Sequence, residues 1–169
     1  MGFTAVPSAG AKLRRSVLAS LMSDRTPLFV KKTSDETVNN SSTLQDDNEL
    51  VLAGAASTTY DLEMRLIVNT GTTPDLKFTF TVPSGTTGSA QLFTGSNPDS
   101  AASGLQGPFS ITATAAASGV GADQVLIVTG IVVTSSTAGN VQLQWAQNVA
   151  NLSDTKVKAD SYLILRKVA

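Results

Sequence analysis

Regular alternation of apolar and polar residues in the middle of the chain constrains the fold more than any other feature. Between positions 60 and 69 every second residue is apolar, and the residues between them are mostly polar or charged. The apolar set is Tyr60, Leu62, Met64, Leu66 and Val68. Because successive side chains of a strand point to opposite faces, this pattern predicts a strand with one buried face and one largely solvated face.

A second strand with the same alternation is predicted over residues 75–82. Its inward positions are Leu76, Phe78, Phe80 and Val82. The Gly-Thr-Thr-Pro link at 71–74 predicts that these two strands form a hairpin. The SSTAGN link at 135–140 has the small residues that a turn requires, and it predicts a second hairpin further along the chain.

The remaining segments complete an all-β pattern. Further strands are predicted at residues 28–32, 44–52, 90–94, 109–115, 124–134, 141–147 and 156–167. The polar segment 33–43 has the composition of a loop or an exposed edge, and a long loop follows the weak strand at 90–94. About eight or nine strands without alternating helices predict an antiparallel β-sandwich, with a jelly roll as the favoured arrangement.

The first 27 residues differ from the rest, and we predict that they form a docking segment ahead of a β-sandwich domain at 28–169. Ser8 can cap a short helix over residues 9–22. Its apolar stripe consists of Leu13, Val17, Leu18 and Leu21, whereas Arg14 and Arg15 fall off the stripe. Because so short a helix is unstable alone, we expect the stripe to dock on the sandwich or on a neighbouring subunit.

Composition excludes several classes of function. Twelve basic and thirteen acidic residues give a formal charge of −1, so the chain lacks the basic surplus that nucleic-acid binding requires. The absence of Cys and His removes thiolate nucleophiles, Ser-His-Asp catalysis and the usual zinc ligands, and we expect no cofactor. No run of about 18 apolar residues occurs and no good signal peptide is present. We therefore expect no membrane span, and we expect a chain that is made and used in the cytosol or is released from it without cleavage.

An acidic cluster lies just before or within the strand at 44–52. Asp46, Asp47 and Glu49 offer oxygen ligands of the kind that Ca²⁺ prefers. The segment lacks the spaced acids and the glycine of a known calcium loop. The favoured interpretation is therefore a solvated, charged entry to a strand, which discourages pairing between sheet edges.

A carboxylate pair for glycoside hydrolysis would have to come from Asp61 and Glu63, or from Asp75 or Asp123 brought near them by folding. Asp61 and Glu63 share one face of the predicted strand, and Arg65 continues the row. A solvated outer face explains all three residues, so we do not expect an enzyme.

Trp145, the only tryptophan, lies on the inward face of the predicted strand at 141–147, and we predict a core anchor rather than a ligand-stacking platform. Three glutamines of this strand suit a subunit interface or solvent: Gln142, Gln144 and Gln147. The N-x-S/T patterns at Asn39, Asn40 and Asn151 are chance matches in a chain without a secretory signal.

Four segments of the sequence resemble those of a known family. They are KKTSDETVNNSSTLQDDNELVL at 31–52, DLKFTFTVPSGTTG at 75–88, AGNVQLQWAQN at 138–148 and SYLILRKVA at 161–169. In this order they resemble a β domain of structural proteins of tailed actinobacteriophages, of minor tail, fibre or head-associated type. The resemblance covers about residues 28–169, and AGAKLRRSVL at 9–18 is similar to leaders of such chains. It defines no active site.

The resemblance implies a component of the virion, assembled in the host cytoplasm. One globular domain with a docking segment suits a capsid decoration or head-associated protein that binds the major capsid protein or tail proteins, and by analogy a homotrimer. The alternative is a tail or fibre protein whose loops, such as 84–107, bind a cell-surface glycan. Solvent-facing aromatic rings would favour the alternative, and this loop region offers only Phe93 and Phe109.

Overall fold

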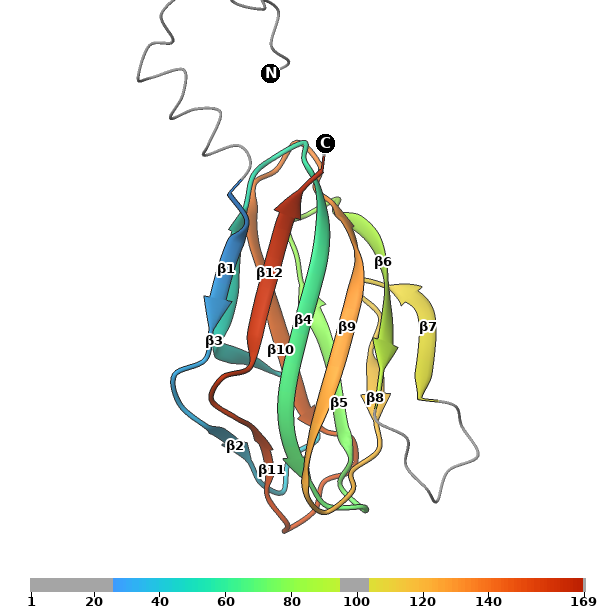
Figure 1. Ribbon diagram of the computed structural model, residues 1–169. Coiled ribbons are helices and arrows are strands. Elements are labelled where there is room, and N and C mark those ends of the chain that lie inside the picture. The colour runs from blue at the N-terminus through green and yellow to red at the C-terminus, as the bar shows by residue number, and fades with distance from the viewer. Residues whose placement is uncertain (1–25, 95–103, 169) are drawn as a thin grey trace, which may run out of the picture.

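The computed structural model describes residues 26–94 and 104–168, and this part of the chain is entirely β-structure and turns, with no helix (Figure 1). The docking helix predicted from Leu13, Val17, Leu18 and Leu21 lies outside the described residues. The strands are β1 (Leu28–Lys31), β2 (Glu36–Val38), β3 (Gln45–Gly54), β4 (Thr59–Thr70), β5 (Leu76–Thr81), β6 (Thr87–Phe93), β7 (Leu105–Ser110), β8 (Ala115–Ala117), β9 (Asp123–Val133), β10 (Gly139–Gln147), β11 (Thr155–Val157) and β12 (Tyr162–Lys167).

These strands form two antiparallel sheets. The larger sheet has the order β1-β12-β4-β9-β6-β7, and the short β11 pairs with β4 and with β2. The smaller sheet has the order β3-β10-β5-β8. In Figure 1 the strands β1, β12, β4 and β9 run side by side across the front layer, and β6 and β7 extend that layer at one edge.

One apolar core lies between the sheets. The five alternating residues of β4, from Tyr60 to Val68, are buried as predicted, none of them more than 4% exposed. From the smaller sheet, Leu76, Phe78 and Phe80 of β5 face them, and Val82 is only partly buried against the same core. The alternating pattern of both strands is therefore explained by one face packed against the opposite sheet.

Both predicted hairpins are wrong. The strand β4 belongs to the larger sheet and β5 to the smaller one, so the link at 71–74 crosses from one sheet to the other. The link at 135–140 likewise carries the chain from β9 to β10 across the core. Alternation identifies the buried face of a strand, but it is the same whether the next strand pairs at its edge or stacks across the core.

The count of eight or nine strands is also too low. Three strands of only three residues, β2, β8 and β11, are too short to show alternation. One of them, β2, lies inside the segment 33–43. Among the described strands it pairs with β11 alone, so it is an edge strand, in agreement with the exposed-edge alternative for that segment. The predicted strand at 109–115 resolves into the end of β7 and the start of β8, and the one at 156–167 into β11 and β12.

An irregularity in β3 positions the site described below. Gln142 of β10 lies opposite Val51, whereas Gln144, two residues on, lies opposite Asp46. The residues 47–50 therefore bulge out of the regular pairing. Asp47 stabilises this bulge, because its Oδ1 accepts hydrogen bonds from the backbone N–H groups of Glu49 at 3.0 Å and Leu50 at 2.8 Å. As bulges do elsewhere, this one redirects a side chain, here that of Asp47, into the interior.

Candidate functional site

A lysine buried at the edge of the molecule is the centre of the candidate site. Lys32 directly follows β1 and is 1% exposed. Its backbone donates to the carbonyl of Ser161 and accepts from the N–H of Asp160, which fixes the position of the residue. Its ammonium Nζ lies 2.9 Å from both carboxylate oxygens of Asp47 and 3.1 Å from Oε2 of Glu36.

Asp47 is the fully buried partner in this pair. Its Oδ2 accepts a hydrogen bond from the indole Nε1 of Trp145 at 3.1 Å, in addition to the Lys32 contact. Its Oδ1 accepts from Lys32 and from the two backbone donors of the bulge. Since a buried charge is costly unless it is paired and hydrogen-bonded, these contacts explain how the carboxylate is held without water.

Two further carboxylates close the cluster towards solvent. Glu36 on β2 accepts from the backbone N–H of Asn48 at 3.2 Å and from the amide of Gln45 at 3.1 Å, as well as from Lys32. Glu49 lies 3.9 Å from the Lys32 Nζ. One cation is thus surrounded by three carboxylates, and we call Lys32, Glu36, Asp47 and Glu49 the buried charge cluster.

Glu49 is held as an anion by the loop that follows Lys32. The hydroxyl of Thr33 donates at 2.7 Å, the backbone N–H of Thr33 at 2.7 Å, and Ser34 adds two longer hydrogen bonds. These donors, the Thr33 hydroxyl first, lower the pKa of Glu49 from its ordinary 4.5 to about 2. The loop at 33–34 is thereby tied to the bulge of β3.

This depressed pKa predicts an acid-sensitive contribution to stability. Because the pKa of Glu49 is lower in the folded state, its contribution is present above pH 4.5 and is lost as the pH falls from 4.5 towards 2. We expect Glu49→Gln to lower the urea midpoint at pH 7, and we expect the difference from the natural protein to shrink at pH 4 and further at pH 3. A difference that stays constant over this range would contradict the assignment.

The structure separates the three acids that the sequence placed in one cluster. Asp46 is exposed and accepts a hydrogen bond from Gln144 at 2.8 Å, whereas Asp47 faces the interior and Glu49 binds Thr33 and Ser34. Interpreting Asp47 as part of a solvated strand entry is therefore wrong. In the part of the chain that the structure describes, no group of three or more acidic side chains is placed to hold a metal ion.

The predicted carboxylate pair lies on the outer face of the larger sheet. Arg166 of β12 bridges Asp61 at 3.3 Å and Glu63 at 2.7 Å, and the Tyr162 hydroxyl donates to Glu63 at 2.8 Å. The hydrogen bonds from Arg166, first, and Tyr162 lower the pKa of Glu63. The hydrogen bond to Glu63 in turn raises the pKa of Tyr162. These contacts hold Glu63 as an anion and link β4 to β12 on the surface of the sheet.

The other two candidate acids lie elsewhere. Asp123 pairs opposite Asn69 and forms a salt bridge with Lys158, at the other end of β4 from Asp61. Asp61 and Asn69 are separated along the strand by about 26 Å at the usual rise per residue. Asp75 accepts a hydrogen bond at its Oδ1 from the backbone N–H of Gly119, at 2.8 Å. Folding does not bring Asp75 or Asp123 to the Asp61–Glu63 pair.

The strand β10 carries one confirmed prediction and one correction. Trp145 is 0% exposed and anchors the core, as predicted. Gln142 donates to the backbone carbonyl of Asp47 at 3.1 Å, so it supports the bulge. Gln147 is 0% exposed and holds two loops by accepting from the backbone N–H groups of Ser41 and Asn151, so neither a subunit interface nor solvent explains it.

A second feature is an apolar surface on the outer face of the larger sheet. Five exposed residues of β6, β7 and β9 form it, and we call them the outer band: Phe93 at 40%, Leu105 at 48%, Val125 at 44%, Ile131 at 42% and Val133 at 38%. Phe93 pairs opposite both Leu105 and Ile127, which places the three strands of the band side by side. Exposed apolar side chains gathered on one face of a sheet are typical of a contact surface.

The chain also has a shallow pocket where the start of β1 and the end of β12 lie near the end of β3. Its lining residues are Thr26, Leu28, Ala53, Ala55, Tyr60, Leu165 and Lys167, none of which carries a carboxylate. In residues 26–94 and 104–168 there is no helix long and apolar enough to cross a membrane.

No protein-family model matches the chain, and no curated protein matches it either.

Proposed function

We propose that the chain is a non-enzymatic structural component of a tailed-phage virion, a capsid decoration or head-associated protein that binds neighbouring subunits. The outer band carries the proposal, because it offers exposed apolar side chains on the outer face of a sheet. The buried charge cluster fits the same role, since it ties the first strand to the body of the domain.

The strand order supports the proposal. We infer a β-sandwich of jelly-roll type, in which β1-β12-β4-β9 and β3-β10-β5-β8 are the two four-stranded layers and β6 and β7 extend one of them. Jelly rolls are common in viral capsid proteins, and they also occur in lectins. This argument rests on fold analogy, and the family resemblance of residues 28–169 adds to it.

Self-association provides the first test. We expect the full chain to form a homotrimer in sedimentation experiments at neutral pH. Replacing Ile131, an exposed residue of β9 in the outer band, with lysine should weaken association at least about tenfold, because desolvating one unpaired charge costs more than the roughly 1.4 kcal/mol that tenfold represents.

Thr81→Lys is the matched control. Thr81 is exposed on the outer face of the smaller sheet, so the same charge is added on the opposite side of the molecule. Association that is unchanged by Ile131→Lys, or weakened equally by both variants, would contradict the outer band as the assembly surface. Density at regular positions over the capsid lattice in a reconstruction of the virus particle would support the decoration role.

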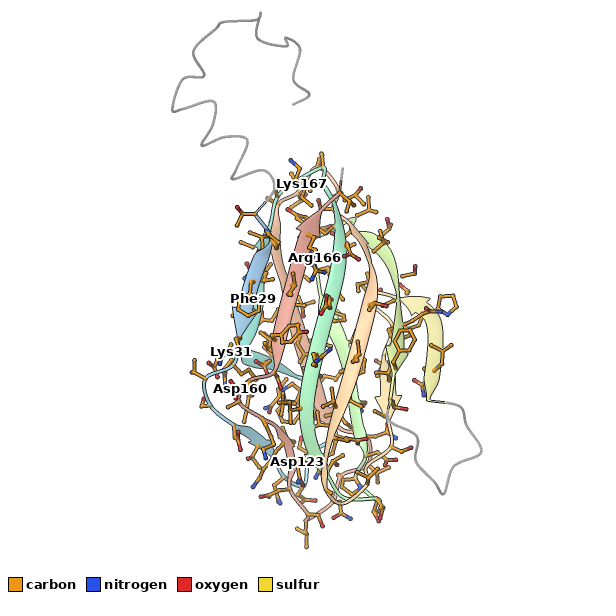
Figure 2. The ribbon with its side chains drawn as sticks, viewed as in Figure 1. Phe29, Lys31, Asp123, Asp160, Arg166 and Lys167 are labelled. Atoms are coloured by element: carbon orange, nitrogen blue, oxygen red, sulfur yellow. The ribbon has the colours of Figure 1, made fainter. Side chains whose placement is uncertain are left out.

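A tail or fibre protein that binds a host glycan is the second candidate. Phe29 of β1 is 57% exposed, and its ring lies 6.0 Å from that of Tyr162, over which the Arg65 guanidinium lies at 5.8 Å. In Figure 2 Phe29 and Arg166 lie on the neighbouring strands β1 and β12. Exposed rings beside charged side chains suit sugar stacking. Binding of cell-wall glycan fragments that Phe29→Ala abolishes, with density confined to the tail, would favour this candidate.

A further inference from the structure

The buried charge cluster holds an amine and a carboxyl group in direct contact, away from water. We propose that Lys32 and Asp47 condense in the folded protein to an intramolecular isopeptide bond, with Glu36 as the proton carrier. The bond would be a covalent modification site at the edge of the domain. It does not depend on the proposed assembly role.

The first argument is proximity. The Lys32 Nζ is equidistant, at 2.9 Å, from both oxygens of Asp47. Because both oxygens are bonded to Cγ, this places Nζ within about 3.3 Å of that carbon, inside the roughly 3–3.5 Å range of a near-attack arrangement. The two side chains are 1% and 0% exposed, so bulk water does not compete with the amine or favour hydrolysis of the product.

The second argument is the set of donors around the carboxyl group. The backbone N–H groups of Glu49 and Leu50 both point at Oδ1, at 3.0 and 2.8 Å. Two backbone donors on one oxygen form an oxyanion hole, which stabilises the negative charge that develops when an amine attacks a carbonyl carbon. The Trp145 indole N–H binds the other oxygen, Oδ2, and so orients the group.

The third argument is a proton path that balances the reaction. The ammonium of Lys32 transfers one proton to Oδ2 of Asp47, which leaves a neutral amine and a neutral acid. The nitrogen lone pair attacks Cγ, and the C=O electron pair moves to Oδ1. Glu36, 3.1 Å from Nζ, takes a proton from the nitrogen and returns it to Oδ2, which leaves as water when the Cγ–Oδ2 bond breaks and the carbonyl re-forms. One ammonium and one carboxylate become one amide and one water.

Charge favours this direction. Three carboxylates surround a single ammonium, so the cluster holds more negative than positive charge. The product replaces two buried charges with one neutral amide, which removes the desolvation cost of the pair. The bond would also join the end of β1 in the larger sheet to β3 in the smaller one, and so fasten the strand that follows residues 1–27.

Intact mass measurement of the purified full chain tests the proposal. We expect the natural protein to be lighter by one water molecule than its sequence requires, judged against Lys32→Arg so that processing of the chain ends cancels. After denaturation and trypsin digestion, we expect no cleavage after Lys32 and an internally linked peptide 32–65 lacking one water. Full mass with normal cleavage after Lys32 would overturn the proposal, and so would an equal water loss in Lys32→Arg.

Variants separate the roles of the groups. Asp47→Asn should give the same linked peptide with loss of ammonia instead of water. Glu36→Gln should slow the appearance of the linked form about 100-fold or more during refolding, as loss of a general acid–base does. Lys31→Arg is the control, because Lys31 is exposed and pairs with Asp160 (Figure 2), and this variant should retain the water loss. An unchanged rate in Glu36→Gln would overturn the role of Glu36.

Discussion

Asp47→Ala should lower the free energy of unfolding by about 3 kcal/mol, because it leaves the buried ammonium of Lys32 without its closest counter-ion. Lys32 is 1% exposed, so solvent does not replace the lost carboxylate in the folded structure. Glu36 at 3.1 Å remains as a partial partner, which keeps the expected loss at the lower end of the range for a broken buried pair. Urea unfolding at pH 7 measures the change. If Lys32 and Asp47 are joined by an amide, the variant also loses that cross-link, and the expected loss is larger.

Asp46→Ala is the matched control for this prediction. Asp46 is the preceding residue, carries the same charge, is exposed and accepts one hydrogen bond from Gln144. We expect a change of less than about 0.5 kcal/mol, as for most surface substitutions. Similar small effects in the two variants would mean that the Lys32–Asp47 contact contributes nothing to stability.

Phe78→Ala should lower the free energy of unfolding by about 3–5 kcal/mol, the usual cost of removing a buried phenylalanine from a core. Phe78 is 0% exposed on the inner face of β5, and its ring meets those of Phe80 and Phe109 edge-on at 6.3 and 6.4 Å. The cavity would open between the two sheets, where the neighbouring strands can relax only partly. Urea unfolding again provides the measurement.

Phe29→Ala is the corresponding control, because Phe29 is the same residue type but 57% exposed on β1. It should cost less than about 1 kcal/mol, mostly from its contact with Tyr162. If the two phenylalanines cost the same, the inner faces of the sheets do not share a packed core, and the two-layer arrangement would have to be revised.

Strand positions and buried faces could be predicted from the sequence where strands are long. The alternation over 60–69 and 75–82 identified the inward residues of β4 and β5, since a period of two records burial on one side. Three-residue strands such as β2 and β8 were missed or merged, because they are too short for a period to be visible. Alternation does not show which strands are neighbours in a sheet, and both predicted hairpins were wrong for that reason.

The candidate site was the least predictable part. Asp46, Asp47 and Glu49 were singled out as an acidic cluster, but nothing local distinguishes the exposed Asp46 from the buried Asp47. Lys32 was not considered at all, since a lysine after a short strand is usually solvated. The one signal of the site in the sequence was a tryptophan predicted to be buried, together with acids on another predicted strand. To use this signal, one would have to know that the two strands are neighbours.

The sequence by itself determined the all-β class, the face that each long strand buries and the core role of Trp145, because hydrophobic periodicity acts within one strand and needs no partner. Only the tertiary structure decided that β4 and β5 lie in different sheets and that a bulge turns Asp47 towards Lys32. These outcomes depend on contacts between residues 15 or more positions apart, such as Lys32 with Asp47 and Asp47 with Trp145. Local pattern carries no information on such contacts, because the free energy of burying a charge depends on which partner the fold brings to it.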